Sequence, residues 1–201
     1  MVIPWVRISW ISDDKGYGLL AERDIPKGTV TFAQDGLDIV LSEKQLESID
    51  NSLLEYVEKY SYEDFMGNRI ISWDFGKYMN HDDNANTLST GYGFEVAIRD
   101  IKKGEEVTDD YRIFSTHHDT SFKSPPHALE DIRPWPEKLI KKWDKDILSA
   151  LLNYNLVTQP LESFIPELTL KQIRQLNIEE YQSVARALPL RYKLQTQNSL
   201  L

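Results

Sequence analysis

Short stretches of alternating apolar and polar residues dominate the first part of the chain. Residues 5–11 (WVRISWI) have this pattern, and the turn signal Asp13-Asp14-Lys15-Gly16 follows them. Residues 29–33 (TVTFA) are β-branched and aromatic, which is typical of strands. The segments that we expect to be strands are 5–11, 19–21, 29–33, 94–98 and 106–108.

Helical spacing of apolar residues appears between residues 42 and 57 and again in the last third. Ser42 and Gln45 form a capping-box pattern before apolar residues at helical spacing, and a break is expected near residues 50–52. Pro134 and Pro136 suit a helix start, and an apolar face runs from Leu139 to Leu152. Asn177 with Glu180 predicts a further helix over about residues 178–188.

These patterns predict an α+β protein with two parts. Residues 1–119 form the β-rich part, and residues 120–201 form a helical C-terminal extension. Residues 115–128, which are rich in Ser, Pro and His, are the expected linker.

An internal similarity joins two segments of the β-rich part. Residues 21–28 (AERDIPKG) resemble residues 97–104 (AIRDIKKG), 76 positions later. Each copy follows an expected strand and ends in a polar Lys-Gly turn. Two copies do not make a repeat protein, and a chance similarity of two turns stays open.

The charge is negative and unevenly distributed. The 201 residues carry a net charge of −9; residues 1–119 hold 12 basic and 23 acidic side chains, and residues 120–201 hold 11 and 9. An acidic surface attracts basic peptides and repels polyanions, so direct nucleic-acid binding is not expected. A merely solubilising acidic surface is the alternative.

Cysteine is absent, which excludes disulfides, cysteine–zinc clusters and a thiol nucleophile. No apolar run is long enough to cross a membrane, and the first residues (MVIPWVRISW) lack the pattern of a signal peptide. We therefore expect an intracellular, cytoplasmic protein without membrane contact.

Residues 79–87 (MNHDDNANT) concentrate Asp and Asn around a histidine. A surface loop, a calcium loop and part of a binding pocket are the three alternatives. The spacing of Asp82, Asn84 and Asn86 is that of an EF-hand loop, but Thr87 stands where glycine is needed and Gly93 where glutamate is needed. The calcium interpretation is therefore disfavoured.

Three segments in order carry a more specific signal. They are residues 15–21 (KGYGLLA), residues 78–86 (YMNHDDNAN) and residues 104–111 (GEEVTDDY). In order and spacing they resemble the SET-domain family of protein lysine methyltransferases, over about residues 5–114. The resemblance implies a SET-type fold of small β-sheets with a knot-like crossing.

The resemblance also implies residue roles. It implies that Gly16, Tyr17 and Gly18 bind S-adenosyl-L-methionine together with Asn80 and His81. Asn86 would hold the crossing together, because a buried crossing needs short amide side chains that donate and accept. Tyr111 matches the last tyrosine of the family's third motif; it is the implied catalytic residue and also contacts the cofactor. A tyrosine in the protein core is the alternative for Tyr111.

Asp109 is the main departure from the family pattern, which has an aromatic residue there, lining the lysine channel. Strand alternation predicts that Asp109 and Tyr111 point to the same side. A carboxylate in the channel would hold the substrate lysine as an ammonium ion and oppose catalysis, unless it is solvated, neutralised or turned away. It would equally recruit a basic substrate.

Other departures affect the loop and the closure of the site. Ala85 replaces a proline of the family, Asp82-Asp83 replace Ser-Cys, and Gln34 stands near where many members have a tyrosine. The family's cysteine–zinc closure is absent, so Phe114, Phe122, Trp135 or the helical tail are candidates to close the site. His117 and His118 have no accompanying ligand set, and we expect no metal site.

The sequence therefore predicts an S-adenosylmethionine-dependent protein-lysine N-methyltransferase acting on a basic protein or peptide. The alternative is a catalytically weak or inactive SET fold that binds peptides or proteins.

Overall fold

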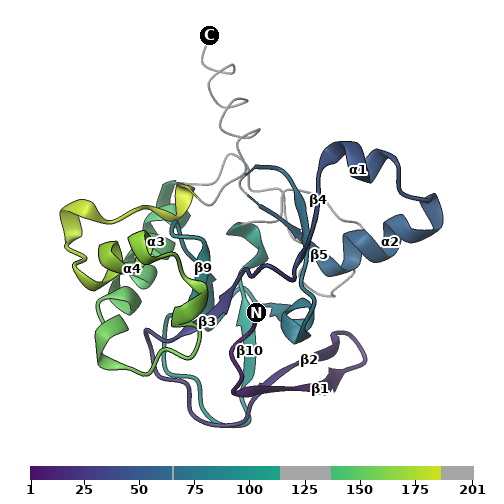
Figure 1. Cartoon of the computed structure of the whole chain (residues 1–201). Helices are drawn as coiled ribbons and strands as arrows, with labels where there is room; N and C mark the ends of the chain where they lie inside the picture. Colours follow the sequence, from purple (N-terminus) through teal and green to yellow (C-terminus); the bar gives the residue numbers. More distant parts are fainter. Residues whose placement is uncertain (65, 114–136, 187–201) are drawn as a thin grey trace.

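The computed structural model describes residues 1–64, 66–113 and 137–186 (Figure 1). Its main sheet has seven strands, in the order β1-β2-β10-β8-β9-β3, with β7 added beside β10. The strands are β1 (Val6–Ser12), β2 (Gly16–Ala21), β3 (Val30–Ala33), β7 (Asn80–His81), β8 (Thr87–Ser89), β9 (Phe94–Ala97) and β10 (Glu106–Asp109). All five expected strands are confirmed.

The two similar segments form a pair of matched turns. Ile25 and Ile101 exchange both backbone hydrogen bonds, at 2.8 and 2.9 Å. The amide of Gly28 donates to Ala97 O, and the amide of Gly104 donates to Ala21 O. Each glycine therefore bonds to the first residue of the other segment. Both glycines have positive φ, which a residue with a side chain rarely adopts. The similarity is therefore structural: each turn completes the other.

Between β3 and β7 the chain forms a separate small sheet with two helices. The three-stranded sheet has the order β4 (Ile39–Leu41), β6 (Arg69–Ile71), β5 (Ser61–Glu63), and the helices are α1 (Glu43–Glu47) and α2 (Asn51–Tyr60). Gln45 Oε1 accepts from the Ser42 amide at 2.9 Å, and Asp50 accepts from the Ser52 amide at 2.8 Å. The capping box and the break near residue 50 are confirmed.

The C-terminal part packs on the side of the main sheet opposite to α1 and α2 (Figure 1). It contains α3 (Glu137–Leu151) and α4 (Glu167–Arg174). Trp143, Ile147, Ala150 and Leu151 of α3 are buried, as the apolar face predicts. Helix α4 was not predicted.

The predicted helix over residues 178–188 is wrong for the described part. Only two 3₁₀ turns form there, Ile178–Glu180 and Val184–Arg186. Asn177 does cap Glu179 and Glu180, but Tyr181 is extended. The Asp144 carboxylate on α3 explains the difference, because it accepts hydrogen bonds from Tyr181 Oη, Ser183 Oγ and the Val184 amide.

One continuous hydrophobic core includes residues of both parts. Gln159 adds polar contacts between them: its Nε2 donates to Gly28 O, and its Oε1 accepts from the Val30 amide. The expected linker, with the boundary at residues 119 and 120, lies outside the described residues. Among the helices that the structure describes, none has the length and apolar character needed to cross a membrane.

Candidate functional site

The glycine turn at the start of β2 is the first element of the site. The turn predicted at residues 13–16 is present, and Gly16 ends it with φ +71°. Glycine adopts this left-handed conformation without steric cost. A Cβ on Gly18 would come within 2.7 Å of Asn80 Nδ2, Glu106 Oε1 and Ile11 Cγ1. The backbone therefore approaches its neighbours closely, as the motif requires.

Asn80 joins this turn to the centre of the sheet. Strand β7 runs parallel to β10, with Asn80 opposite Thr108 and His81 opposite Asp109. Asn80 Nδ2 donates to Tyr17 O at 3.2 Å and to Glu106 Oε1 at 2.8 Å. Lys15 closes the group with an ion pair to Glu106 Oε2 at 2.8 Å. The first two sequence motifs thus meet at one place.

Asn86 holds the chain crossing between residues 80–86 and β10. It is 1% exposed; its Nδ2 donates to Glu106 O at 2.7 Å, and its Oδ1 accepts from the Thr108 amide at 2.9 Å. One buried amide side chain therefore pairs with two backbone groups of another segment, as expected for this residue.

Tyr111 meets His81 beyond the end of β10. The Tyr111 amide donates to His81 Nδ1 at 3.2 Å, and the two ring centroids are 5.5 Å apart. The Tyr111 hydroxyl donates to Met79 O. Burial, with smaller contributions from Asp109 and Glu95, raises the pKa of Tyr111 above its usual range. The hydroxyl therefore stays protonated and acts as a donor.

His81 is neutral in this environment. Burial lowers its pKa, although the nearby carboxylates of Asp110 and Asp83 act in the opposite direction. Its Nε2 is buried, lies 3.5 Å from Asp83 Oδ1, and makes no hydrogen bond with any described residue. Asp83 is therefore the described carboxylate nearest to this nitrogen.

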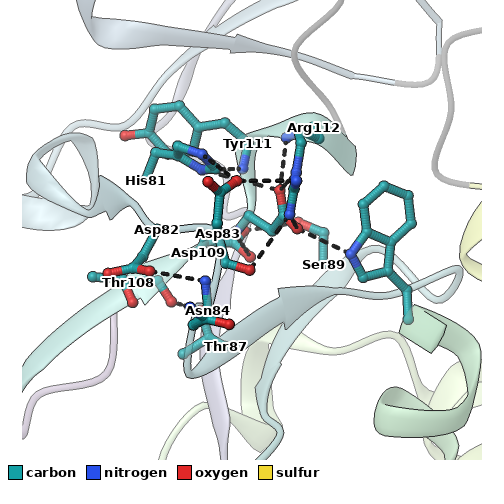
Figure 2. A network of polar contacts seen from close by, with 12 residues as sticks. His81, Asp82, Asp83, Asn84, Thr87, Ser89, Thr108, Asp109, Tyr111 and Arg112 are labelled. Carbon is teal, nitrogen blue, oxygen red and sulfur yellow. Dashed lines mark hydrogen bonds and ion pairs between the residues drawn. The ribbon is translucent and has the colours of Figure 1, made fainter. Parts of the chain in front are cut away.

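A partly buried ionic group next to Tyr111 joins the site to the C-terminal part (Figure 2). Arg112 contacts both oxygens of Asp110, at 2.7 and 2.6 Å, and reaches Asp83 Oδ1 at 3.0 Å. Trp143 Nε1 of α3 donates to Asp110 Oδ2 at 3.0 Å. Sequence reasoning gave no role to Asp110, Arg112 or Trp143, although Asp110 lies inside the third motif.

The prediction that Asp109 and Tyr111 share a strand is wrong. Strand β10 ends at Asp109, and Tyr111 begins a 3₁₀ turn (Tyr111–Ile113), so strand alternation does not relate their side chains. Asp109 is 1% exposed; its Oδ1 accepts from the Asp110 amide at 2.7 Å, and its Oδ2 accepts from Ser89 Oγ at 3.2 Å. Burial raises the pKa of Asp109 to about 7. Near neutral pH its carboxyl is therefore partly neutralised.

A cavity of about 370 Å³ lies on the Ser89 side of this carboxyl. Gln34 is among its lining residues, as are Ser89 and Glu95. Gln182 and Arg186 of the C-terminal part also line it, so the tail contributes to its wall. From the sequence, Gln34 was expected where many members of the family have a tyrosine, and the helical tail was a candidate to close the site. Glu95 was given no role.

Among the residues that the structure describes, no group of three or more His, Asp or Glu side chains is placed to hold a metal ion. His117 and His118 lie outside the described residues. So do Phe114, Phe122 and Trp135, the aromatic candidates for closing the site.

Comparison with known proteins decides the family. The SET domain model matches residues 16–112, which include the second and third motifs and all of the first except Lys15. Residues 16–112 are a SET domain. The SET-type fold of small β-sheets that the resemblance implies is confirmed, and so are the C-terminal helices that the sequence pattern predicts.

The other comparisons add little. A search of curated proteins gives no match to the chain. Among solved structures, a crystal structure of a candidate histone methyltransferase from Plasmodium falciparum matches at 18% identity with a TM-score of 0.39. The match covers 55% of this chain and 95% of the other. A TM-score this low carries no argument.

The residues of the SET domain fit S-adenosylmethionine, the cofactor that its motifs imply. The close approach at Gly18 leaves bare backbone facing Asn80, and the buried His81 Nε2 makes no hydrogen bond with a described residue. The Met79 carbonyl oxygen and the Tyr111 hydroxyl oxygen lie next to each other. Two oxygens, each with partial negative charge, suit a positively charged sulfonium.

Proposed function

We propose that this SET domain transfers a methyl group from S-adenosylmethionine to the side-chain amine of a lysine in a basic protein. One observation carries the proposal. The glycine turn, Asn80, His81 and Tyr111 converge through two hydrogen bonds of 3.2 Å. One joins Asn80 Nδ2 to Tyr17 O, and the other joins the Tyr111 amide to His81 Nδ1. Segments about 60 and 30 residues apart thus form one site.

S-adenosylmethionine supplies an electrophilic methyl group on a positively charged sulfur. The chain supplies position and electrostatics, which carry most of the rate in such an in-line transfer. In our proposal Gly16, Tyr17, Gly18, Asn80 and His81 bind and orient the cofactor. Tyr111, with its hydroxyl protonated and beside Met79 O, orients the acceptor amine.

Charge supports a basic substrate. Residues 1–119 carry 23 acidic and 12 basic side chains, and the cavity next to Asp109 is lined by Glu63, Asp64 and Glu95. An acidic surface raises the local concentration of a basic partner and repels nucleic acid. A lysine-bearing protein or peptide inside the cell is therefore the proposed substrate.

A second candidate function rests on Asp109. A SET fold with a carboxyl group at this channel position would bind a basic peptide without methylating it, if the carboxylate kept the lysine charged. The raised pKa of Asp109 argues for the enzyme, because a partly protonated carboxyl holds an ammonium ion less strongly.

Calorimetric titration with S-adenosylmethionine tests the proposal. We expect the wild-type protein to bind in the micromolar range and Asn80→Ala to lose at least tenfold in affinity, with its fold checked by thermal unfolding. Asn84→Ala is the matched control, because Asn84 is exposed in the same loop. Methylation of polylysine and basic proteins, followed by mass spectrometry, then separates the enzyme from the binding module. A folded wild-type protein that ignores millimolar cofactor would refute both the cofactor and the reaction.

A further inference from the structure

Four neighbouring strands place a row of side chains on one face of the main sheet. Asp109 of β10 is opposite Thr87 of β8, and Ser89, two residues later, points to the same side. Ser89 is opposite Glu95 of β9, and Glu95 is opposite Phe32 of β3. The sheet register therefore brings Asp109, Ser89 and Glu95 together.

Ser89 is the cross-strand neighbour of Glu95 and donates to Asp109 Oδ2 at 3.2 Å, so the two carboxyl groups lie on either side of one side chain. Burial, and then the charge of Asp109, raise the pKa of Glu95 well above its usual value, which favours a proton on one carboxyl of the pair. Glu95 Oε2 is buried, and no donor among the described residues reaches it. Ser89 Oγ and the Asp110 amide hold the Asp109 carboxyl in place.

The cavity of about 370 Å³ gives this pair access to a substrate. Glu95 and Ser89 line it, and Phe32, Tyr62 and Tyr92 supply aromatic walls. Its size is within the range of small-ligand sites. An aromatic cavity with carboxyl groups suits an alkyl chain that ends in a cation.

The pair also lies within electrostatic range of the cofactor side of the site. Asp109 and Glu95 both contribute to the raised pKa of Tyr111. Tyr62, which also lines the cavity, has its pKa raised by burial and then by Glu95. Glu95 thus lines the cavity, and Asp109 precedes by two residues the tyrosine that we assign to methyl transfer.

We propose that the Asp109–Glu95 pair is the proton acceptor that converts the substrate ammonium into the nucleophilic amine. This inference rests on the proposed methyl transfer. The N–H bond of the ammonium breaks, and the proton goes to the ionised carboxyl of the pair. The freed nitrogen lone pair then forms the N–CH₃ bond, and the electrons of the S–CH₃ bond remain on sulfur. The pair returns its extra proton to water.

A pair suits this task better than a single carboxylate does. An ordinary aspartate with a pKa near 4 is too weak a base and would hold the ammonium as an ion pair. Burial raises the pKa of Asp109 to about 7 and that of Glu95 well above its usual value. A general base is most effective when its pKa is near the working pH. Asp110, which would disfavour charge on Asp109, is itself neutralised by Arg112.

Infrared spectroscopy of the protein alone provides a test that does not involve catalysis. We expect the wild-type protein at pH 6 to show a protonated-carboxyl band that shifts in frequency in both Glu95→Gln and Asp109→Asn and disappears in the double variant. Glu58→Gln, on the exposed face of α2, is the control and should leave the band unchanged. A wild-type spectrum without this band, or a band that neither single variant shifts, would overturn the inference.

Turnover gives the second readout, with S-adenosylmethionine and polylysine as the probes. Glu95→Gln should lower kcat at pH 7 by about 100-fold, as general-base loss does. The deficit should shrink at alkaline pH, where free lysine is already neutral. Cofactor titration of the same variants confirms that their fold and cofactor site are intact, and Asp109→Asn should behave like Glu95→Gln.

The outcomes separate the inference from the proposed function. Wild-type turnover that both variants match at every pH would overturn the proton-acceptor role and leave the methyltransferase standing. Cofactor binding without methylation of any lysine probe would remove the reaction, and the inference would fall with it. The infrared band decides independently whether the pair shares a proton.

Discussion

Trp143 Nε1 donates a hydrogen bond to Asp110 Oδ2 at 3.0 Å, and both residues are at most 2% exposed. Trp143 lies on α3, whereas Asp110 lies between β10 and Tyr111. The C-terminal helix is therefore attached to the residue that precedes the proposed catalytic tyrosine. The extension acts as part of the site's support, together with Arg112 (Figure 2).

Replacing Trp143 by Phe should destabilise the protein by about 2–3 kcal/mol. The substitution keeps most of the apolar volume but removes a buried hydrogen bond to a charged acceptor, which contributes about 1.5–3 kcal/mol. Urea unfolding of both proteins measures the difference. The affinity for S-adenosylmethionine should fall as well, because Asp110 then loses one of its constraints.

Trp10→Phe is the control for this substitution. Trp10 is 55% exposed, so the same chemical change should alter the free energy of unfolding by less than about 0.5 kcal/mol. Equal effects at both positions would show that the Trp143–Asp110 contact has no special role.

Asn86→Ala should cost about 2–4 kcal/mol of stability. The substitution leaves Glu106 O and the Thr108 amide without their partner, and each unsatisfied buried group costs about 1–3 kcal/mol. Chemical denaturation checks this value. Hydrogen exchange at Thr108 should quicken more than at the other β10 amides, because its amide has lost its acceptor.

Asn84→Ala, two positions earlier, separates the crossing from the loop. Asn84 is exposed, and its hydrogen bond to Asp82 uses the backbone amide, which the substitution keeps. Its cost should therefore be below about 0.5 kcal/mol. A comparable loss at both positions would contradict the role assigned to Asn86.

The Asp109 carboxyl should make stability fall as the pH rises from about 4 to about 7. Its folded-state pKa is raised to about 7, so the native protein binds more protons than the unfolded chain in this window. A shift of about three units corresponds to at most about 4 kcal/mol, fully developed above pH 7. Glu95 acts in the same direction.

Comparison of the wild-type protein with Asp109→Asn isolates this effect. The variant should gain stability relative to the wild type as the pH rises through this window, measured by urea unfolding at each pH. Asp14→Asn, in the exposed turn after β1, should leave the pH profile unchanged. Parallel profiles for the wild type and Asp109→Asn would mean that Asp109 ionises normally.

Local sequence signals were sufficient for five of the seven strands of the main sheet and for the motif residues. Strand alternation and glycine turns act over a few residues, so β1 to β3, β9 and β10 were predictable. The strands of the small sheet, β4, β5 and β6, have three residues each, too few for alternation to be recognised. Helix α4 escaped for a similar reason, since it has only eight residues.

The Asp109–Glu95 pair and the extended Tyr181 depend on long-range contacts. Asp109 meets Glu95 only because β8 lies between β10 and β9 in the sheet, which no local pattern indicates. Tyr181 leaves the predicted helix because Asp144, 37 residues away, accepts its hydroxyl hydrogen bond. The Asp144 contact overrides the local helix preference of residues 178–188, whereas the Asp109–Glu95 placement has no local sequence signal at all.

Gly18→Ala should abolish most of the affinity for S-adenosylmethionine at a modest cost in stability. Its Cβ would lie 2.6 Å from Asn80 Nδ2 and 2.7 Å from Glu106 Oε1, so Asn80 must move away from the glycine turn. Such overpacking costs about 1–3 kcal/mol, whereas a displaced binding residue should lower cofactor affinity by at least tenfold. Gly36→Ala is the matched control, because its Cβ would meet no atom within 4 Å, and it should bind cofactor normally. Calorimetric titration of both variants, each first shown to be folded, decides the point: unchanged affinity in Gly18→Ala would place the cofactor elsewhere than beside Asn80.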